Sequence, residues 1–255
     1  MKKFLIKFIC VLYCAFSTRV EKFIYCKINT NFQLKNDFYS KGFDILATNQ
    51  SFSISSIIND FEVIKSSEYF NRLIVHKDKV ESLMKYVFQN PDVISFLKAR
   101  TGFDYKINFF IAYETKSLPE EQKNKEVYAN NWHKDKPFSK NTLKIIIPLE
   151  DITVEDGGLE IITPNNSHLP DSLVNKKNVE PDYKMVEKTN TLLFFLPNIC
   201  YHRAGVPSKG RSRKQIMFQL NPYKYWCYSS NIFQKQFFIE PKFPLLNHFE
   251  SITKL

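Results

Sequence analysis

Two histidines and one aspartate are spaced so that they could bind a single metal ion. His133 and Asp135 lie two residues apart, and in a β-strand residues i and i+2 share one face. His202 follows the apolar run from Leu192 to Leu196, which is typical of a buried strand. Two imidazoles and one carboxylate on one side of a metal leave the other side open, as in non-haem iron centres. The spacing therefore predicts an Fe(II) site.

A fixed positive charge follows the second histidine. Arg213 lies eleven residues beyond His202, at the start of the apolar run 215–220. Its planar guanidinium is suited to holding a carboxylate at two points. By strand alternation Arg213 shares a face with Gln215 rather than with Lys214.

Lys144 is a candidate second cation of the site. By alternation it lies on the same face as Thr142 and Ile146. We take Lys144 and Thr142 as candidate cofactor-binding residues. The alternative for Lys144 is a solvated strand residue.

Several landmarks stand in a fixed order along the chain. They are His133-x-Asp135, Ile147-Pro148-Leu149-Glu150-Asp151, Gly157-Gly158-Leu159, Pro164-Asn165-Asn166-Ser167-His168, Leu192 to Leu196, His202 and Arg213. In order and approximate spacing the set resembles the Fe(II)/2-oxoglutarate-dependent dioxygenases, and within them the phytanoyl-CoA dioxygenase-like family. A weaker similarity at Phe38-Tyr39-Ser40-Lys41-Gly42-Phe43 extends the resemblance from about residue 30 to about residue 222.

The resemblance implies a role for each candidate residue. His133, Asp135 and His202 would bind Fe(II), and Arg213 would bind the far carboxylate of 2-oxoglutarate. Arg213 is favoured over Arg211 because its spacing from His202 matches the family. The implied reaction consumes 2-oxoglutarate and O2, releases succinate and CO2, and oxidises an unactivated C–H bond. Because the carboxylate ligand is retained, hydroxylation is expected rather than halogenation.

Two departures from the family concern the cosubstrate and a turn. Arg203-Ala204 stand where family members usually have Gly-Ser, so a hydroxyl that often helps to bind 2-oxoglutarate is missing. The turn from Pro164 to His168 is one residue longer than the family's. Neither departure touches the three proposed metal ligands, and nothing points to phytanoyl-CoA itself as substrate.

The other histidines have simpler interpretations. His76 and Asp78 form a second His-x-Asp, but they start a helical pattern, in which residues i and i+2 do not share a face. His168 lies in the long turn and is interpreted as structural. His248 has no chemical partners nearby in the sequence.

Composition limits the classes of protein that the chain could be. Its 255 residues are 44% hydrophobic and 15% aromatic, which indicates a folded chain with a sizeable core. The many Phe and Tyr residues favour strands, and only 6 glycines argue against a Gly-rich phosphate loop. The net charge of +10 favours an anionic or polar small-molecule substrate. No nucleic-acid-binding module is evident, no membrane association is expected, and the oligomeric state stays open.

Helical patterns come first along the chain and strand patterns follow. Apolar spacing predicts helices over 53–66 and 78–89, and Asn90-Pro91-Asp92 is typical of the start of a third helix, which we expect to end at Arg100. Strands are predicted over 105–113, 143–149, 159–163, 183–187, 191–196 and 215–220, and a loop over 114–130. The expected fold is mainly β with flanking helices, a double-stranded β-helix (jelly roll, cupin-like), as the resemblance also implies. We expect residues 1–130 to support a catalytic core at 131–222, with residues 223–255 covering it.

The first sixteen residues resemble a short signal peptide. Two lysines precede apolar residues, but the run from Phe8 to Phe16 is too short to span a bilayer and no clear cleavage site follows. An enzyme that uses 2-oxoglutarate needs the cytosolic pool of it. We therefore expect a cytoplasmic protein whose N-terminus packs on the domain as a strand or helix, with a targeting segment as the alternative.

The combined hypothesis is an Fe(II)/2-oxoglutarate-dependent oxygenase that hydroxylates a small polar or anionic metabolite. One alternative is an oxidative cyclase or desaturase of a biosynthetic pathway, and epimerisation would also be compatible with the same ligands. The other alternative is a catalytically silent jelly-roll protein that binds metal.

Overall fold

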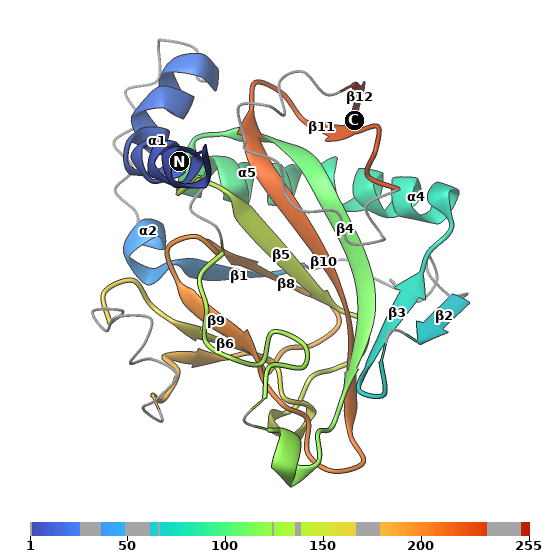
Figure 1. Ribbon diagram of the computed structural model, residues 1–255. Coiled ribbons are helices and arrows are strands. Elements are labelled where there is room, and N and C mark those ends of the chain that lie inside the picture. Colours follow the sequence, from blue (N-terminus) through green and yellow to red (C-terminus); the bar gives the residue numbers. More distant parts are fainter. Residues whose placement is uncertain are drawn as a thin grey trace.

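Two mainly antiparallel β-sheets of unequal size form the centre of the molecule (Figure 1). The computed structural model describes residues 2–25, 37–48, 62–65, 67–123, 125–135, 139–166, 179–233 and 251–255. Within these ranges the helices are α1 (Lys2–Tyr25), α2 (Phe38–Lys41), α4 (Lys77–Phe88) and α5 (Pro91–Thr101), with short 3-10 turns η1 (Glu120–Gln122) and η2 (Val154–Asp156). The strands are β1 (Phe43–Ala47), β2 (Glu62–Lys65), β3 (Phe70–Ile74), β4 (Asp104–Lys116), β5 (Leu143–Pro148), β6 (Leu159–Ile162), β7 (Tyr183–Lys184), β8 (Thr191–Phe195), β9 (Tyr201–Ala204), β10 (Ser212–Tyr223), β11 (Cys227–Ser229) and β12 (Ile252–Lys254).

The large sheet has nine strands in the described part of the chain. Its main path runs β1-β8-β5-β10-β4-β11-β12, and β3 pairs with both β2 and β4. The pairing is antiparallel except between β4 and β11. The small sheet has the order β7-β6-β9. This is the jelly-roll class predicted from the sequence, and β1, β3 and β4 show that the large sheet also takes strands from before residue 130.

One face of the large sheet is covered by helices. Phe218 on β10, Ile145 on β5 and Phe194 on β8 form one register row. Phe88 of α4 packs edge-on against Phe218 at 5.2 Å between ring centroids, and Phe96 of α5 lies 5.0 Å from Phe194. Because side chains alternate along a strand, the neighbours of this row in sequence face the opposite way, toward the small sheet.

Both helices follow from the sequence as expected. The apolar side chains of α4 that were predicted to share one face are fully buried: Val80, Leu83, Met84 and Val87. Burial of each such side chain stabilises the fold by roughly 1.5–3 kcal/mol. At the start of α5, Asn90 Oδ1 accepts a hydrogen bond from the Asp92 amide at 2.9 Å, and Pro91 takes the first helical position. The predicted cap of this helix is confirmed.

The helix predicted over 53–66 is wrong where the structure can be compared with it. Residues 49–61 and 66 lie outside the described part of the chain, but Glu62–Lys65 is strand β2. Val63 pairs with Leu73 and Ile64 with Arg72. Pairing of this β-branched segment with β3 outweighs its helical spacing of apolar residues. The strand predicted over 105–113 is longer than expected, because β4 continues to Lys116.

The N-terminal segment is a helix that contacts the domain through a buried carboxylate. Glu21 of α1 accepts hydrogen bonds from Tyr13 at 2.7 Å, Ser139 at 2.8 Å and Asn141 at 2.6 Å. Burial raises the pKa of Glu21. No helix in the described ranges is long and apolar enough to span a membrane.

Candidate metal centre

A backbone bridge between two distant segments brings the two histidines together. The His133 amide donates to the His202 carbonyl at 3.1 Å, and the His202 amide donates back at 2.9 Å. The two imidazole centroids lie 4.3 Å apart. The Asp135 amide donates to the Pro197 carbonyl at 2.9 Å, which fixes the aspartate relative to β9. The structure thus gathers all three residues that the sequence singled out.

The three side chains offer ligand atoms that lie within 4.8 Å of one another. Asp135 Oδ1 is 3.9 Å from His133 Nε2 and 3.5 Å from His202 Nε2. His133 Nδ1 lies 2.8 Å from the Asn131 carbonyl and His202 Nδ1 lies 3.3 Å from the Cys200 carbonyl. We assign the proton to Nδ1 in both rings from these contacts, which leaves both Nε2 lone pairs for a metal.

The donor set fits a divalent metal. His202 Nε2 is buried and has no hydrogen-bond partner among the described residues, and a buried polar atom of this kind needs a partner. Burial lowers the pKa of His202 to about 4, so the ring is neutral and able to bind a metal at pH 7. Two neutral imidazoles and one carboxylate are a ligand set typical of non-haem Fe(II).

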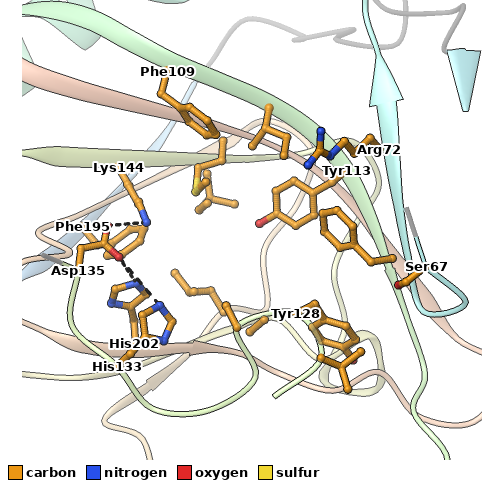
Figure 2. A pocket seen from close by; sticks show the side chains of 18 residues that line it. Ser67, Arg72, Phe109, Tyr113, Tyr128, His133, Asp135, Lys144, Phe195 and His202 are labelled. Carbon is orange, nitrogen blue, oxygen red and sulfur yellow. Dashed lines mark ion pairs between the residues drawn. The ribbon is translucent and has the colours of Figure 1, made fainter. Parts of the chain in front are cut away.

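Lys144 contacts the aspartate of this cluster. Its Nζ lies 2.7 Å from Asp135 Oδ2, as Figure 2 shows. Burial opposes ionisation of Asp135, but the neighbouring ammonium of Lys144 counteracts it, and the pKa of this carboxyl lies well below its usual range. Lys144 therefore contacts the carboxylate of the candidate metal cluster, and its predicted contact with the cosubstrate stays a prediction.

Thr142 lies apart from this group. Its hydroxyl donates to Asn221 Oδ1 at 3.0 Å in a buried pair, and it is not among the residues that line the cavity. Its predicted role in cofactor binding stays a prediction that the geometry does not favour.

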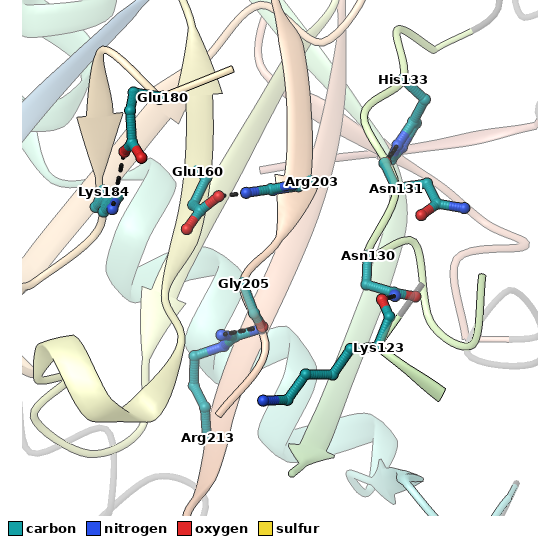
Figure 3. A network of polar contacts seen from close by, with 10 residues as sticks. All are labelled: Lys123, Asn130, Asn131, His133, Glu160, Glu180, Lys184, Arg203, Gly205 and Arg213. Carbon is teal, nitrogen blue, oxygen red and sulfur yellow. Dashed lines mark hydrogen bonds and ion pairs between the residues drawn. The ribbon is translucent and has the colours of Figure 1, made fainter. Parts of the chain in front are cut away.

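Arg213 is buried, with 1% of its surface exposed. Its Nη1 donates to the carbonyls of Asp156 at 3.2 Å and Gly205 at 3.4 Å, the latter shown in Figure 3. Nε and Nη2 are buried and have no hydrogen-bond partner in the described part of the chain. These two donors form one side of the guanidinium fork, which matches the two oxygens of a carboxylate. Burial lowers the pKa of Arg213, and the group remains a cation because an arginine in a protein keeps its proton.

A cavity of about 510 Å³ lies against the His133, Asp135 and His202 cluster (Figure 2). His133, Asp135, His202 and Lys144 line one end of it. Ala204, which precedes the Gly205 that accepts from Arg213, lines it as well. Most of the remaining lining is aromatic or aliphatic: Phe70, Phe109, Ile111, Tyr113, Tyr128, Ile146, Leu159, Phe195 and Met217.

The sequence analysis did not single out several of the residues that line the cavity. Tyr128 comes from the segment predicted to be a loop near the site, whereas Arg72 comes from β3, for which no element was predicted. Phe70, Arg72 and Ile74 alternate with Asn71 and Leu73, a strand pattern that could have placed Arg72 on a cavity face. The rival His76 is exposed at the start of α4. His168 and His248 lie outside the described residues.

Comparison with known proteins supports the fold. No protein-family model and no curated protein matches the sequence. Among solved structures, the non-haem α-ketoglutarate-dependent epimerase SnoN of nogalamycin biosynthesis matches with a TM-score of 0.51 at 14% identity, over 72% of this chain and 80% of its own. HygX from Streptomyces hygroscopicus matches with a TM-score of 0.51 at 12% identity, over 76% and 87%. The carbocyclase SnoK of nogalamycin biosynthesis matches with a TM-score of 0.51 at 12% identity, over 89% and 97%. The chain shares the jelly-roll fold of these enzymes.

Proposed function

We propose that this chain is an Fe(II)/2-oxoglutarate-dependent oxygenase of the phytanoyl-CoA dioxygenase-like family. The observation that carries the proposal is the unpartnered Nε and Nη2 of buried Arg213, near a cavity that also contains the His133, Asp135 and His202 cluster. A metal cluster alone would suit many proteins. A buried fork that lacks a carboxylate, one residue contact away from the same cavity, calls for a ligand such as 2-oxoglutarate.

The residues would divide the work as follows. His133, Asp135 and His202 hold Fe(II), and Arg213 holds the far carboxylate of 2-oxoglutarate. Iron bound with 2-oxoglutarate and O2 supplies the oxidation of an unactivated C–H bond, with succinate and CO2 as co-products. Lys144 holds Oδ2 of Asp135, which would leave Oδ1 for the metal, and the apolar lining would keep bulk water from the reacting groups. HygX, of the same fold, was crystallised with nickel and 2-oxoglutarate, which supports this choice of ligands.

The proposed outcome is hydroxylation of a small polar or anionic metabolite in the cytoplasm. The carboxylate ligand Asp135 is present, so no position is left open for a halide. Oxidative cyclisation or desaturation is a second candidate, favoured by the shared fold of the carbocyclase SnoK and the epimerase SnoN. A silent metal-binding jelly roll is disfavoured, because such a protein has no need of an unpartnered buried arginine.

Substrate-independent turnover tests the proposal. The purified chain, supplied with Fe(II), 2-oxoglutarate and air, is expected to form succinate slowly. His202→Ala removes a ligand and should abolish the activity, whereas His76→Ala alters the exposed His-x-Asp copy and should leave it intact. No succinate from an iron-loaded wild type would support the silent binding protein instead, and equal loss in both variants would contradict the specific role of His202.

A further inference from the structure

Arg72 is an arginine at the cavity wall that the proposed chemistry does not use. It lies on β3 opposite Tyr113 of β4, which in turn lies opposite Gln215 of β10. Arg72 lines the cavity, and Figure 2 shows its guanidinium beside Tyr113, across the cavity from His133 and His202. Its Nε is buried and has no hydrogen-bond partner within the described ranges. A guanidinium with an unpaired buried nitrogen at the wall of a cavity is suited to binding an anion.

The cosubstrate does not account for this charge. One carboxylate of 2-oxoglutarate is used at the metal and the other at Arg213. The ammonium of Lys144 is already paired with Asp135 at 2.7 Å. Among the described residues that line the cavity, Asp135 is the only acid, so Arg72 has no counter-charge there. A third anion is needed, and the substrate is the molecule left to supply it.

The surface between Arg72 and the metal end of the cavity is apolar. Ile146 of β5, Met217 of β10 and Ile111 of β4 form one register row, and all three line the cavity. Lys144 lies at one corner of this band, two residues before Ile146, and Arg72 lies at the opposite corner, on β3. Three interstrand steps of about 4.8 Å separate the backbones of β5 and β3, or about 14 Å in all.

We propose that the substrate is a mainly apolar molecule with one carboxylate-type anion, which binds Arg72. Its apolar body lies over Ile146, Met217 and Ile111, and the carbon to be oxidised lies at the end near His133 and His202. This placement of the reacting carbon rests on the proposed function, whereas binding of the anion by Arg72 does not. The substrate class is thereby narrowed from a polar or anionic metabolite to an amphipathic acid.

A matched pair of probes tests the anion site directly. 2-Naphthoate and the neutral 2-naphthamide have similar shapes and differ in charge. They are titrated calorimetrically into the full chain in the presence of Ni(II) and saturating 2-oxoglutarate, so that Arg213 is occupied. We expect the wild type to prefer the naphthoate about 10- to 100-fold, as is typical of a hydrogen bond to a charged group. Arg72→Gln should abolish the preference, and Arg72→Lys, which keeps the charge, should restore part of it.

Variants of the other arginine separate this proposal from the cosubstrate site. Arg213→Gln, titrated without 2-oxoglutarate, should retain the preference for naphthoate even though it binds 2-oxoglutarate poorly. The proposal is overturned by equal or undetectable binding of the two probes to the wild type, by a preference that survives in Arg72→Gln, or by a preference lost only in Arg213→Gln. A naphthoate preference that depends on Arg72, in a protein that forms no succinate, would keep the anion site and reject the oxygenase.

Discussion

Lys144 and Asp135 form an ion pair through one carboxylate oxygen, which leaves the other oxygen facing His202. Lys144 Nζ lies 2.7 Å from Oδ2, while Oδ1 is the oxygen that lies 3.5 Å from His202 Nε2. A carboxylate held in this way offers one oxygen to a metal and cannot turn to offer both. The pair would therefore set which oxygen Asp135 offers to a metal, in addition to holding the carboxylate ionised.

Lys144→Met should lower the rate of succinate formation. Without its partner, Asp135 is free to rotate, and loss of a group that orients a metal ligand typically costs about 10- to 100-fold in metal affinity or activity. Fe(II) affinity and the rate are measured on the same preparations. The matched control is Lys214→Met on β10, because Arg213 and Gln215 share a strand face with the cavity-lining Met217, whereas Lys214 points the other way. Unchanged rate and iron affinity in Lys144→Met would show that the ion pair has no positioning role.

Arg213→Lys should weaken binding of 2-oxoglutarate by about 10- to 100-fold, because the ammonium keeps the charge and loses the two-point fork. Calorimetric titration of 2-oxoglutarate into the Ni(II)-loaded protein measures the change. Arg211→Lys is the control, since Arg211 is half exposed and its Nε donates to Asp156 at 2.8 Å instead. Weaker binding of 2-oxoglutarate in Arg211→Lys, with normal binding in Arg213→Lys, would show that Arg211 and not Arg213 binds the cosubstrate.

The stability of the metal-free protein should fall as the pH falls from about 6.5 to about 4. The pKa of His202 is lowered from 6.5 to about 4 by burial. The unfolded chain therefore takes up a proton that the folded chain excludes over this range, and protons favour unfolding. A shift of this size corresponds to an upper limit of about 3 kcal/mol in the free energy of unfolding.

Urea denaturation of the metal-free wild type and of His202→Gln between pH 4 and pH 7 measures this contribution as a difference. The exposed His76 provides the control variant, His76→Gln, which should behave as the wild type. An identical pH dependence in the wild type and His202→Gln would contradict the burial of a neutral imidazole.

Gly157→Ala should destabilise the fold and also weaken 2-oxoglutarate binding. Gly157 has a φ of +60°, and an added Cβ would lie 2.4 Å from the Val206 carbonyl carbon. Gly157 lies between the segments whose carbonyls, of Asp156 and Gly205, hold Arg213. Strained backbone alone costs on the order of 1–3 kcal/mol, and the contact with the Val206 backbone adds to this cost.

Gly210→Ala is the control for this variant. Gly210 has a similar φ of +80° with open space around it, so its replacement should destabilise the fold less and leave 2-oxoglutarate binding unchanged. Equal urea midpoints for the two variants would contradict this.

The closeness of His133 and Asp135 is local in the sequence and can be predicted from it, whereas the approach of His202 depends on a bridge between two distant segments. Residues i and i+2 of an extended segment place His133 and Asp135 together, and a buried run followed by a histidine supplies His202. The helices α4 and α5 are equally local, since apolar spacing and the Asn90 cap are sufficient to predict them.

Contacts between strands that are distant in the sequence could not be predicted from it. Alternation places Lys144 and Ile146 on one face, but no spacing in the sequence predicts that Asp135 lies against Lys144. Arg72 reaches the cavity because β3 pairs with β4. The segment of β2 was predicted to be helical because the sequence does not reveal that it pairs with β3. In each case the determining contact is a strand pairing, whose partner the local pattern does not specify.

The most direct test of the central claim is an anaerobic titration of the chain with Fe(II) and 2-oxoglutarate. A 2-oxo acid that chelates Fe(II) gives a weak visible charge-transfer band, and we expect this band in the wild type. It should be lost in His202→Ala and should require far more 2-oxoglutarate in Arg213→Lys. Bound iron without the band in the wild type would contradict the assignment and leave a jelly-roll protein that binds metal without using 2-oxoglutarate.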